Sequence, residues 1–440
     1  MDREEFQEED ELELLDEEIE EENLPSGGRR GGFGKGLAAG IAGTLVVALV
    51  VSLAARGLFL PVRREGASGM AAEKTGGTTK EALAKDSVKK KMGELADLID
   101  QYYYEGVDTD AVAEGIYMGM LSGLGDPYSN YFTAEEYSSF NESTTGIYYG
   151  IGVVLQQNAE TKAVTALHVY PGTPAEEAGV KDGDMIVKID DTEVNGQELT
   201  ELVTMIKGEE GTKVHLRLAR EGEKDYVETD VERRQIAVPT VQYQMLEGDV
   251  GFIQITEFSE STMEQFEEAL ASLQGEGMKS MIVDLRDNPG GVLQTVCEML
   301  DKLLPKGLIV YTEDKYGSRS NYESDEACMD IPMAVLINGN SASASEIFAG
   351  AVKDYKYGTL IGTKTFGKGI VQTIIPLSDG SAVKVTMAKY FTPKGNYIHG
   401  VGIEPDIELE YKYLGEDDET YDPMHDNQVQ KALEVLQGQK

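Results

Sequence analysis

The sequence predicts an α/β core with an inserted α+β module, an N-terminal helical region and a single transmembrane helix. From about residue 238 to residue 410, short apolar strands alternate with helical stretches, which is typical of an α/β domain. Residues 146–231 instead show short strands separated by turns, with two brief helices between them. Residues 36–55 contain no charged residue and are numerous enough to cross a bilayer as a helix.

Length, charge and composition limit the classes of protein to consider. A chain of 440 residues is long enough for two or three domains, and 41% hydrophobic residues allow a sizeable core. The net charge of −40 argues against a nucleic-acid partner, because phosphate backbones are bound by Lys and Arg. The two cysteines and four histidines show none of the spacings that metal sites use. We therefore expect no metal and no other cofactor.

The first 84 residues are predicted to anchor the chain in a membrane. An acidic run predicts a solvated cytoplasmic tail over 1–35, followed by a transmembrane signal anchor over 36–60 and a flexible linker over 61–84. A cleaved signal peptide is the alternative, because Ser52 and Ala54 offer small residues for cleavage. Positive charges flank the span on both sides and leave its orientation open.

The remaining chain divides into four segments. Residues 85–145 are predicted to be helical, since apolar residues recur at helical spacing from Val88. Residues 146–231 form the α+β module, and residues 232–412 form the α/β core. Residues 413–440 are acidic and then weakly helical, and they are predicted to be a C-terminal tail.

A serine-rich segment, Asn340-Ser-Ala-Ser-Ala-Ser-Glu346, follows the predicted strand Met333–Ile337 and opens a helix. A helix N-terminus presents unpaired N–H groups and the positive end of the helix dipole. A serine hydroxyl there can lie beside donors that stabilise an oxyanion. Taken alone, however, the segment favours simple helix capping by serine.

A second segment, Gly362-Thr-Lys-Thr-Phe-Gly-Lys-Gly369, nearly matches a phosphate-binding P-loop. The match fails because Gly369 replaces the hydroxyl residue that binds Mg²⁺, and because residues 370–375 predict a strand instead of a helix. An ordinary turn lysine is another alternative for Lys368. In a partly buried turn its pKa would be lowered, and a neutral lysine can take a proton from a serine hydroxyl.

A third segment, Asp284-Leu-Arg-Asp-Asn-Pro-Gly-Gly291, predicts a strand that runs into a turn. Backbone N–H groups exposed in such a turn can bind an oxyanion, although alone the segment is consistent with a structural turn. The third segment precedes the other two along the chain. In that chain order, the three segments resemble the motifs of the carboxyl-terminal processing, or tail-specific, proteases, which are serine peptidases with a PDZ domain. The resemblance covers about residues 85–411. It implies a crotonase-like, ClpP-like β-α protease domain over 232–412 and a PDZ domain over 146–231.

The resemblance also implies a catalytic centre with a Ser-Lys dyad. Ser343 would be the nucleophile, Lys368 the general base, and Gln372 the residue that orients the lysine. Gln372 follows Lys368 by four positions, so that the two side chains would share a face on a strand. The family pattern further implies backbone oxyanion donors and one supporting acidic residue, at these positions: Ala344, Gly290 or Gly291, and Asp354.

The PDZ resemblance implies a peptide-binding loop and a regulatory position. Backbone N–H groups of the loop would hold the C-terminal carboxylate of a peptide that adds to the sheet as a strand. The residues of this loop are Gly150, Ile151, Gly152 and Val153. Lys207 stands where many relatives carry Arg, and it is the candidate for coupling peptide binding to the active site, although Lys and Arg differ in geometry.

These inferences predict a membrane-anchored serine endopeptidase that acts on proteins with apolar C-termini. The catalytic domain would lie outside the cytoplasm on a single-pass anchor, and a homodimer is compatible with the resemblance. One rival is a membrane-tethered PDZ scaffold with an inactive protease domain, which the intact Ser343, Lys368 and Gln372 oppose. A second rival is an acyl-CoA enzyme on the related crotonase-like fold, which needs neither a PDZ domain nor an anchor.

Overall fold

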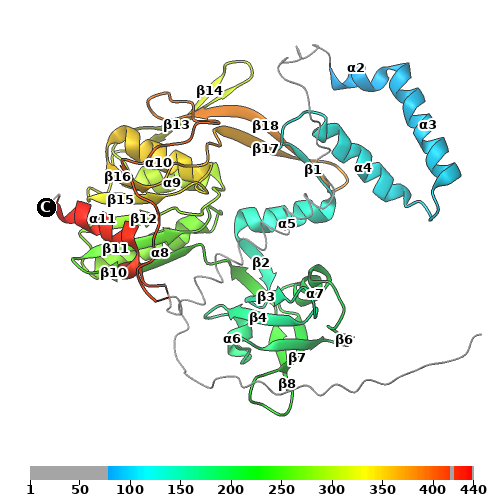
Figure 1. Cartoon of the computed structure of the whole chain (residues 1–440), viewed down its shortest axis with the longest axis horizontal. Helices are drawn as coiled ribbons and strands as arrows, with labels where there is room; N and C mark the ends of the chain where they lie inside the picture. The colour runs from blue at the N-terminus through cyan, green and yellow to red at the C-terminus, as the bar shows by residue number, and fades with distance from the viewer. Residues whose placement is uncertain (1–77, 417–420, 439–440) are drawn as a thin grey trace, which may run out of the picture.

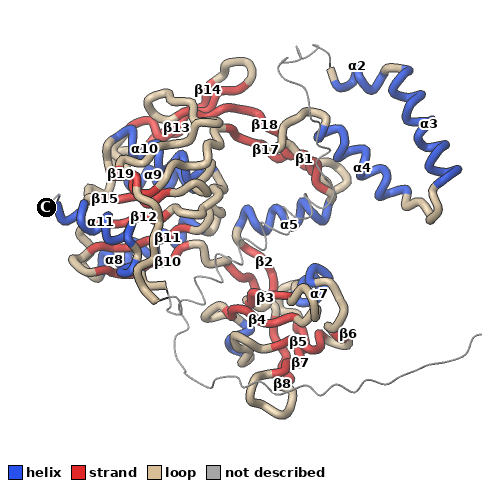
Figure 2. Tube along the Cα trace, in the orientation of Figure 1, coloured by secondary structure: helices blue, strands red, loops and turns tan. Residues whose placement is uncertain are grey.

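The computed structural model describes residues 78–416 and 421–438. The predicted cytoplasmic tail, the predicted anchor and most of the predicted linker fall within residues 1–77 and lie outside these ranges. In the ranges described, no helix is both long and apolar enough to cross a membrane. The described elements form an α/β core, an α+β module and a helical region, as Figures 1 and 2 show.

The centre of the core is a six-stranded, mostly parallel sheet. Its strands, in spatial order, are β10 (Val241–Leu246), β11 (Val250–Ile255), β12 (Ser280–Asp284), β15 (Met333–Ile337), β16 (Gly358–Gly362) and β19 (Ile407–Glu408). β10 runs antiparallel to β11, and all the later neighbours run parallel. β11, β12 and β15 are buried along their whole length, as expected for strands that helices cover on both faces. The predicted α/β core is therefore confirmed.

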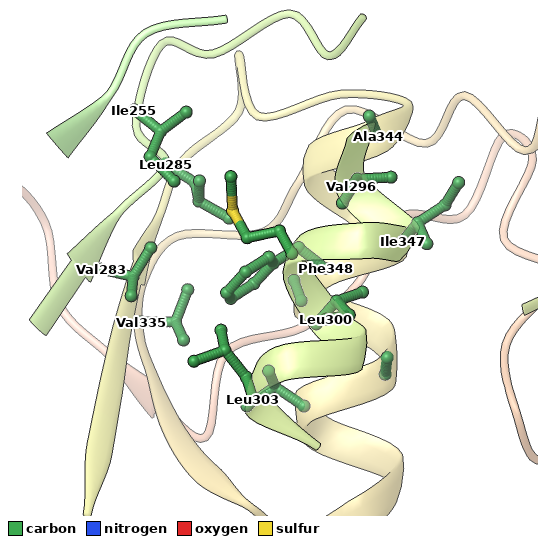
Figure 3. Close-up of a cluster of buried hydrophobic side chains, with 14 of the residues drawn as sticks. Ile255, Val283, Leu285, Val296, Leu300, Leu303, Val335, Ala344, Ile347 and Phe348 are labelled. Carbon is green, nitrogen blue, oxygen red and sulfur yellow. The ribbon is translucent and has the colours of Figure 1, made fainter. Parts of the chain in front are cut away.

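Three helices cover one face of this sheet. They are α8 (Thr262–Gly275), α9 (Leu293–Leu303) and α10 (Ala344–Tyr355). Figure 3 shows strand residues such as Val283 and Val335 packed against Leu300 of α9 and Phe348 of α10. This packing holds the N-terminus of α10 at the carboxyl end of β15, where ligands commonly bind in such sheets.

The C-terminal segment covers the opposite face. A short 3-10 helix, η1 (Pro423–His425), leads into α11 (Asn427–Gly438), which buries Val429, Leu433 and Leu436 against residues of the central strands. A buried ion pair of 2.8 Å between Arg286 and Asp426 adds to this contact. Residues 413–440 were predicted to be a tail, but α11 is part of the core. The apolar stripe of α11 is short and lies among polar residues, so the sequence gives little sign that the helix packs on a sheet. The stripe covers the face of the central sheet that α8, α9 and α10 leave open.

A second, antiparallel sheet lies in the same domain. It contains β17 (Ile370–Pro376), β18 (Ala382–Phe391), β13 (Gly307–Asp314) and β14 (Arg319–Ser324), joined by a strand from the helical region, β1 (Asn130–Phe132). β1 pairs with β18 in the register Asn130 to Lys384. The predicted helical region, residues 85–145, therefore contributes a strand to the core, because backbone hydrogen bonds join β1 to β18.

The helical region itself buries little surface. Its helices are α2 (Thr79–Ala84), α3 (Asp86–Tyr102), α4 (Thr109–Ser122) and α5 (Ala134–Thr145), and none of them contains a buried residue. Along α3 the apolar side chains of Met92, Leu95 and Ile99 are exposed. Among the described residues, the first helix, α2, begins at Thr79, inside the predicted linker.

The α+β module has its own core and sheet. Its strands are β3 (Val153–Gln157), β4 (Val164–Val169), β5 (Met185–Ile189), β6 (Thr192–Glu193), β7 (Lys213–Ala219) and β8 (Val227–Glu232), and its helices are α6 (Pro174–Glu177) and α7 (Leu199–Ile206). A separate pair, β2 (Ile147–Gly150) and β9 (Arg234–Ala237), connects the module to the core. This pair extends the module beyond residue 231, where the sequence placed its end.

Candidate active site

Ser343 occupies the N-cap of α10 in a strained backbone conformation. Its φ is 55° and its ψ is −111°, which a residue with a side chain rarely adopts. Such strain costs about 1–3 kcal/mol and persists where surrounding contacts impose it, often at active sites. The side chain is half-buried, and α10 directs its first N–H groups toward it.

The buried carboxylate of Glu346 imposes this geometry. Its Oε2 accepts hydrogen bonds from the N–H of Ser343 (3.0 Å) and the N–H of Lys368 (2.7 Å). Its Oε1 accepts from Thr365 Oγ1 (2.6 Å) and from the N–H of Gly367 (2.7 Å). Glu346 has no exposed surface. One carboxylate thus ties the serine turn to the lysine loop, although the two are far apart in sequence.

Sequence reasoning did not identify Glu346. A signal existed, because a serine at the N-cap with a glutamate three residues later forms the capping-box pattern. That pattern predicts the hydrogen bond that the Ser343 N–H donates to Glu346. It gives no sign of the contacts between Glu346 and the lysine loop.

Lys368 lies between β16 and β17 and is half-buried. Burial and the nearby cation of Lys384 lower the pKa of the Lys368 ammonium, whereas the carboxylates of Glu346 and Asp126 raise it. Its Nζ lies 5.0 Å from the centre of the Tyr128 ring. Among the described residues, no hydrogen bond joins Lys368 Nζ to the Ser343 hydroxyl, a contact that commonly tightens only when substrate is bound.

Two glycines follow β12 with positive φ, 105° at Gly290 and 142° at Gly291. Gly290 lies directly against the serine turn, since a Cβ there would come within 2.7 Å of Ser343 Cβ and 2.9 Å of Ala344 N. The N–H of Gly290 is donated to Asn288 Oδ1 at 2.8 Å. In the described part of the chain, no hydrogen bond uses the N–H of Gly291 or of Ala344. Of the two glycines, Gly291 therefore keeps an available donor.

Gln372 lies on β17, immediately after a β-bulge at Val371. Its Nε2 donates to Thr386 Oγ1 at 3.3 Å. No hydrogen bond between Gln372 and Lys368 is present in the described residues. Lys368 precedes the strand and the bulge shifts the register, so the simple alternation of side chains does not apply to this pair.

Asp354, near the end of α10, supports a neighbouring turn. Its Oδ2 accepts the N–H of Lys394 at 2.8 Å. The turn is closed by a hydrogen bond of 2.8 Å from the Gly395 N–H to the Thr392 carbonyl. Asp354 thus stabilises the turn at Lys394. Among the described residues, it makes no hydrogen bond to Ser343 or Lys368.

The predicted peptide-binding loop separates β2 from β3. Gly152 breaks the strand with a φ of 83°, and a Cβ there would meet the Thr173 side chain at 2.4 Å. Ile151 is buried in the core of the module. β3, which begins at Val153 after Gly150 closes β2, is an edge strand of its sheet, so its outer edge can accept an added strand.

Lys207 follows α7 and contacts the helical region. Its Nζ forms an ion pair with Glu142 of α5, and it lies 5.3 Å from the centre of the Tyr148 ring. The same end of α5 adjoins the core, where the Glu260 N–H donates to the Thr144 carbonyl at 3.0 Å. Lys207 therefore joins the α+β module to a helix that also touches the core.

His, Cys, Asp and Glu side chains form no candidate metal site in the described part of the chain. Within residues 78–416 and 421–438, no cluster of three or more His, Cys, Asp or Glu side chains could hold a metal ion. Cys297 is buried and burial raises the pKa of its thiol to about 12, which makes it inert as a nucleophile.

Comparison with known proteins identifies the family. The family pattern for peptidase family S41 matches residues 249–409, that for a PDZ domain matches residues 166–220, and that for the activating protease CtpB N-terminal domain matches residues 53–136. The carboxy-terminal processing protease CtpA of Bacillus subtilis (strain 168) is 38% identical over 334 residues, covering 75% of this chain and 71% of that protein.

Two further proteins are similar to this chain. A probable CtpA-like serine protease of Staphylococcus aureus (strain N315) is 36% identical over 324 residues, which cover 73% of this chain and 64% of that protein. The chain thus matches less than two thirds of the length of that relative. A solved structure of a photosystem II D1 C-terminal processing protease is 30% identical, with a TM-score of 0.43, and covers 75% of this chain and 88% of its own. The predicted resemblance is confirmed, and the chain belongs to the carboxyl-terminal processing proteases of peptidase family S41, with a PDZ domain.

Proposed function

We propose that this chain is a membrane-anchored serine endopeptidase that recognises the C-terminus of a protein substrate through its PDZ domain. The observation that carries the proposal is the shared acceptor on Glu346. Its Oε2 binds the backbone N–H groups of both Ser343 and Lys368, so the nucleophile and the base belong to one rigid unit. A capping serine and a turn lysine without a joint function would not require this arrangement.

The chemistry is acyl transfer. Neutral Lys368 accepts the proton of the Ser343 hydroxyl while Oγ attacks the carbonyl carbon of the scissile bond. The N–H groups of Ala344 and Gly291 stabilise the oxyanion that forms. The tetrahedral intermediate releases the amine, which takes the proton from Lys368, and leaves an ester on Ser343. Water, deprotonated by Lys368, hydrolyses the ester and regenerates the enzyme. The lowered pKa of Lys368 supports its role as the general base.

The PDZ domain recognises the substrate. A C-terminal peptide adds alongside the edge strand β3, with its carboxylate at residues 150–153. The ion pair of Lys207 with Glu142 then carries the effect of peptide binding toward the core through α5.

Membrane anchoring rests on the uncharged run in residues 36–55. An outward-facing catalytic domain rests on the family resemblance, because the charges on both sides of this run do not set its orientation. A homodimer is supported by α3, whose apolar residues Leu95 and Ile99 are not covered by any other described part of the chain. Light scattering of the full chain in detergent, beside a Leu95→Glu/Ile99→Glu variant, checks the dimer. An equal mass for both would contradict it.

The function is tested with the full chain in mild detergent and an unstructured protein with an apolar C-terminus. Cleavage, read by mass spectrometry, is expected for the parent and to be lost in Ser343→Ala and in Lys368→Ala. Ser378→Ala, at an exposed serine between β17 and β18, is the matched control and should cleave normally. Cleavage by Ser343→Ala would contradict the assignment of the nucleophile. Blocking the substrate's terminal carboxylate as an amide should slow cleavage, because the substrate then lacks the negative charge that the PDZ domain binds.

A further inference from the structure

The turn Asp126–Ser129, between α4 and β1, lies against the loop of Lys368. The ring of Tyr128 is 5.0 Å from Lys368 Nζ and 6.3 Å from the ring of His399. His399 in turn accepts the N–H of Gly369 on Nδ1 at 3.3 Å. A segment of the N-terminal helical region therefore contacts Lys368, the proposed general base in the core.

A chain of hydrogen bonds runs from this turn to Gln372. Ser129 Oγ donates to Asp126 Oδ2 at 2.6 Å, and it accepts the N–H of Thr386 at 3.1 Å. Thr386 Oγ1 then accepts Nε2 of Gln372 at 3.3 Å. This bond holds the amide nitrogen of Gln372 on Thr386, and Oε1 is the atom of the amide that can accept from an ammonium group. Ser129 is only 3% exposed, so its own two hydrogen bonds are shielded from competing water.

The charged groups that act on Lys368 come from three elements. They are Lys384 of β18, Glu346 of α10 and Asp126 of the turn. Lys384 Nζ lies 5.6 Å from the ring of Phe132 and 5.4 Å from the ring of Phe140, so β1 and α5 hold it in place. Burial opposes ionisation of Asp126, but hydrogen bonds from Ser129, Thr386 and the Tyr128 N–H, together with His399, lower its pKa below the ordinary value. Asp126 is therefore a carboxylate at neutral pH.

We propose that the turn Asp126–Ser129 is a positioning element of the catalytic centre, which orients Gln372 through Thr386 and, together with Lys384, sets the charge around Lys368. The inference rests on the proposed serine-peptidase function. It gives the N-terminal helical region a direct part in catalysis, through residues that are not themselves catalytic.

The hydrogen-bond chain is tested on the full chain with Thr386→Val, which keeps the backbone and removes the hydroxyl. Loss of one such bond should lower kcat about five- to tenfold, with KM within about twofold of the parent. Thr386→Ser should restore kcat, because it returns the hydroxyl. Thr373→Val, at a half-buried threonine of the adjacent strand, is the matched control and should leave kcat unchanged. An unchanged kcat in Thr386→Val, or an equal loss in Thr373→Val, would overturn the inference.

The charge environment is tested by two substitutions that should act in opposite directions. Activity rises as Lys368 loses its proton, so the acid limb of the kcat profile follows the pKa of Lys368. Asp126→Asn removes a charge that stabilises the ammonium and should move the limb to lower pH. Lys384→Met removes a charge that destabilises it and should move the limb to higher pH. Two shifts of the same sign, or none, would contradict the inference.

A second readout does not depend on proteolysis. In a Ser343→Ala background, the pH dependence of trace acetylation of Lys368, read by mass spectrometry, reports its protonation directly. Asp126→Asn and Lys384→Met should move this profile in the same opposite directions. If the parent's cleavage survives Ser343→Ala, the proposed function fails, while the acetylation profiles still support or refute the positioning role.

Discussion

Glu346 is the residue on which the geometry of the site most depends. Four donors bind its carboxylate, and three of them are backbone N–H groups that make no other hydrogen bond within the described residues. Glu346→Ala would leave these donors buried and unpaired, at about 1–3 kcal/mol for each unsatisfied group. We expect the free energy of unfolding of the core to fall by about 3 kcal/mol or more and peptidase activity to be lost.

Urea unfolding followed by circular dichroism checks this expectation. The matched control is Glu264→Ala, at an exposed glutamate in the first turn of α8. Its loss should stay within about 1 kcal/mol, since an exposed charge near a helix N-terminus contributes little more. Similar losses for the two variants would refute the special role of Glu346.

Glu257, two residues after β11, should make stability depend on pH. Burial raises the pKa of its carboxyl to about 7, from the ordinary value of 4.5. Between these pH values the unfolded chain releases a proton that the folded chain keeps, so stability falls as pH rises, by about 3 kcal/mol in total. Glu257→Gln should therefore gain stability over the parent at pH 8 but not at pH 4. A gain that is equal at both pH values would contradict this account.

At the scale of single elements, the turn between β12 and α9 requires glycine. A Cβ at Gly291 would lie 2.1 Å from the carbonyl oxygen of Phe258, which is a backbone atom and cannot move aside. Gly277, after α8, also has a positive φ of 93° but no heavy atom within 4 Å of the same position. Alanine at Gly291 would therefore add a steric collision to the backbone strain, whereas alanine at Gly277 would add the strain alone.

We expect Gly277→Ala to cost about 1 kcal/mol of unfolding free energy, the cost of strain alone. Gly291→Ala should cost about 3 kcal/mol or more and should abolish cleavage, because the turn must move away from Ser343. Thermal and urea unfolding of both variants, with a cleavage assay, measure the difference. Equal stability of the two variants would show that the turn can adjust without cost.

Across the whole molecule, the ion pair of Glu142 with Lys207 connects the PDZ domain to α5. Both side chains are 35% exposed, so the pair should contribute about 0.5–1 kcal/mol, or a two- to fivefold effect on activation by peptide. Glu142→Lys should weaken this activation, and the double reversal Glu142→Lys/Lys207→Glu should restore part of it. The effect should shrink at high salt, because the pair is partly exposed. A double variant as impaired as the single one would exclude direct coupling between the two residues.

The sequence alone determined the α/β core, the α+β module and the serine and lysine segments. These signals are local: the apolar run of β15, the polar start of α10 and the glycines around Lys368 are all read within a few residues. The family pattern added to them, and the matches to related proteases confirmed it.

Only the tertiary structure revealed what holds these segments together. Thr365 reaches Glu346 across 19 positions of sequence, and Thr386 reaches Ser129 across 257. The role of α11 was hidden for the same reason, since its apolar stripe is explained only by the sheet face that it covers. Spacing within a segment predicts which face is buried, but it contains no information about which distant segment the face will meet. That partner is selected by the packing of the whole chain.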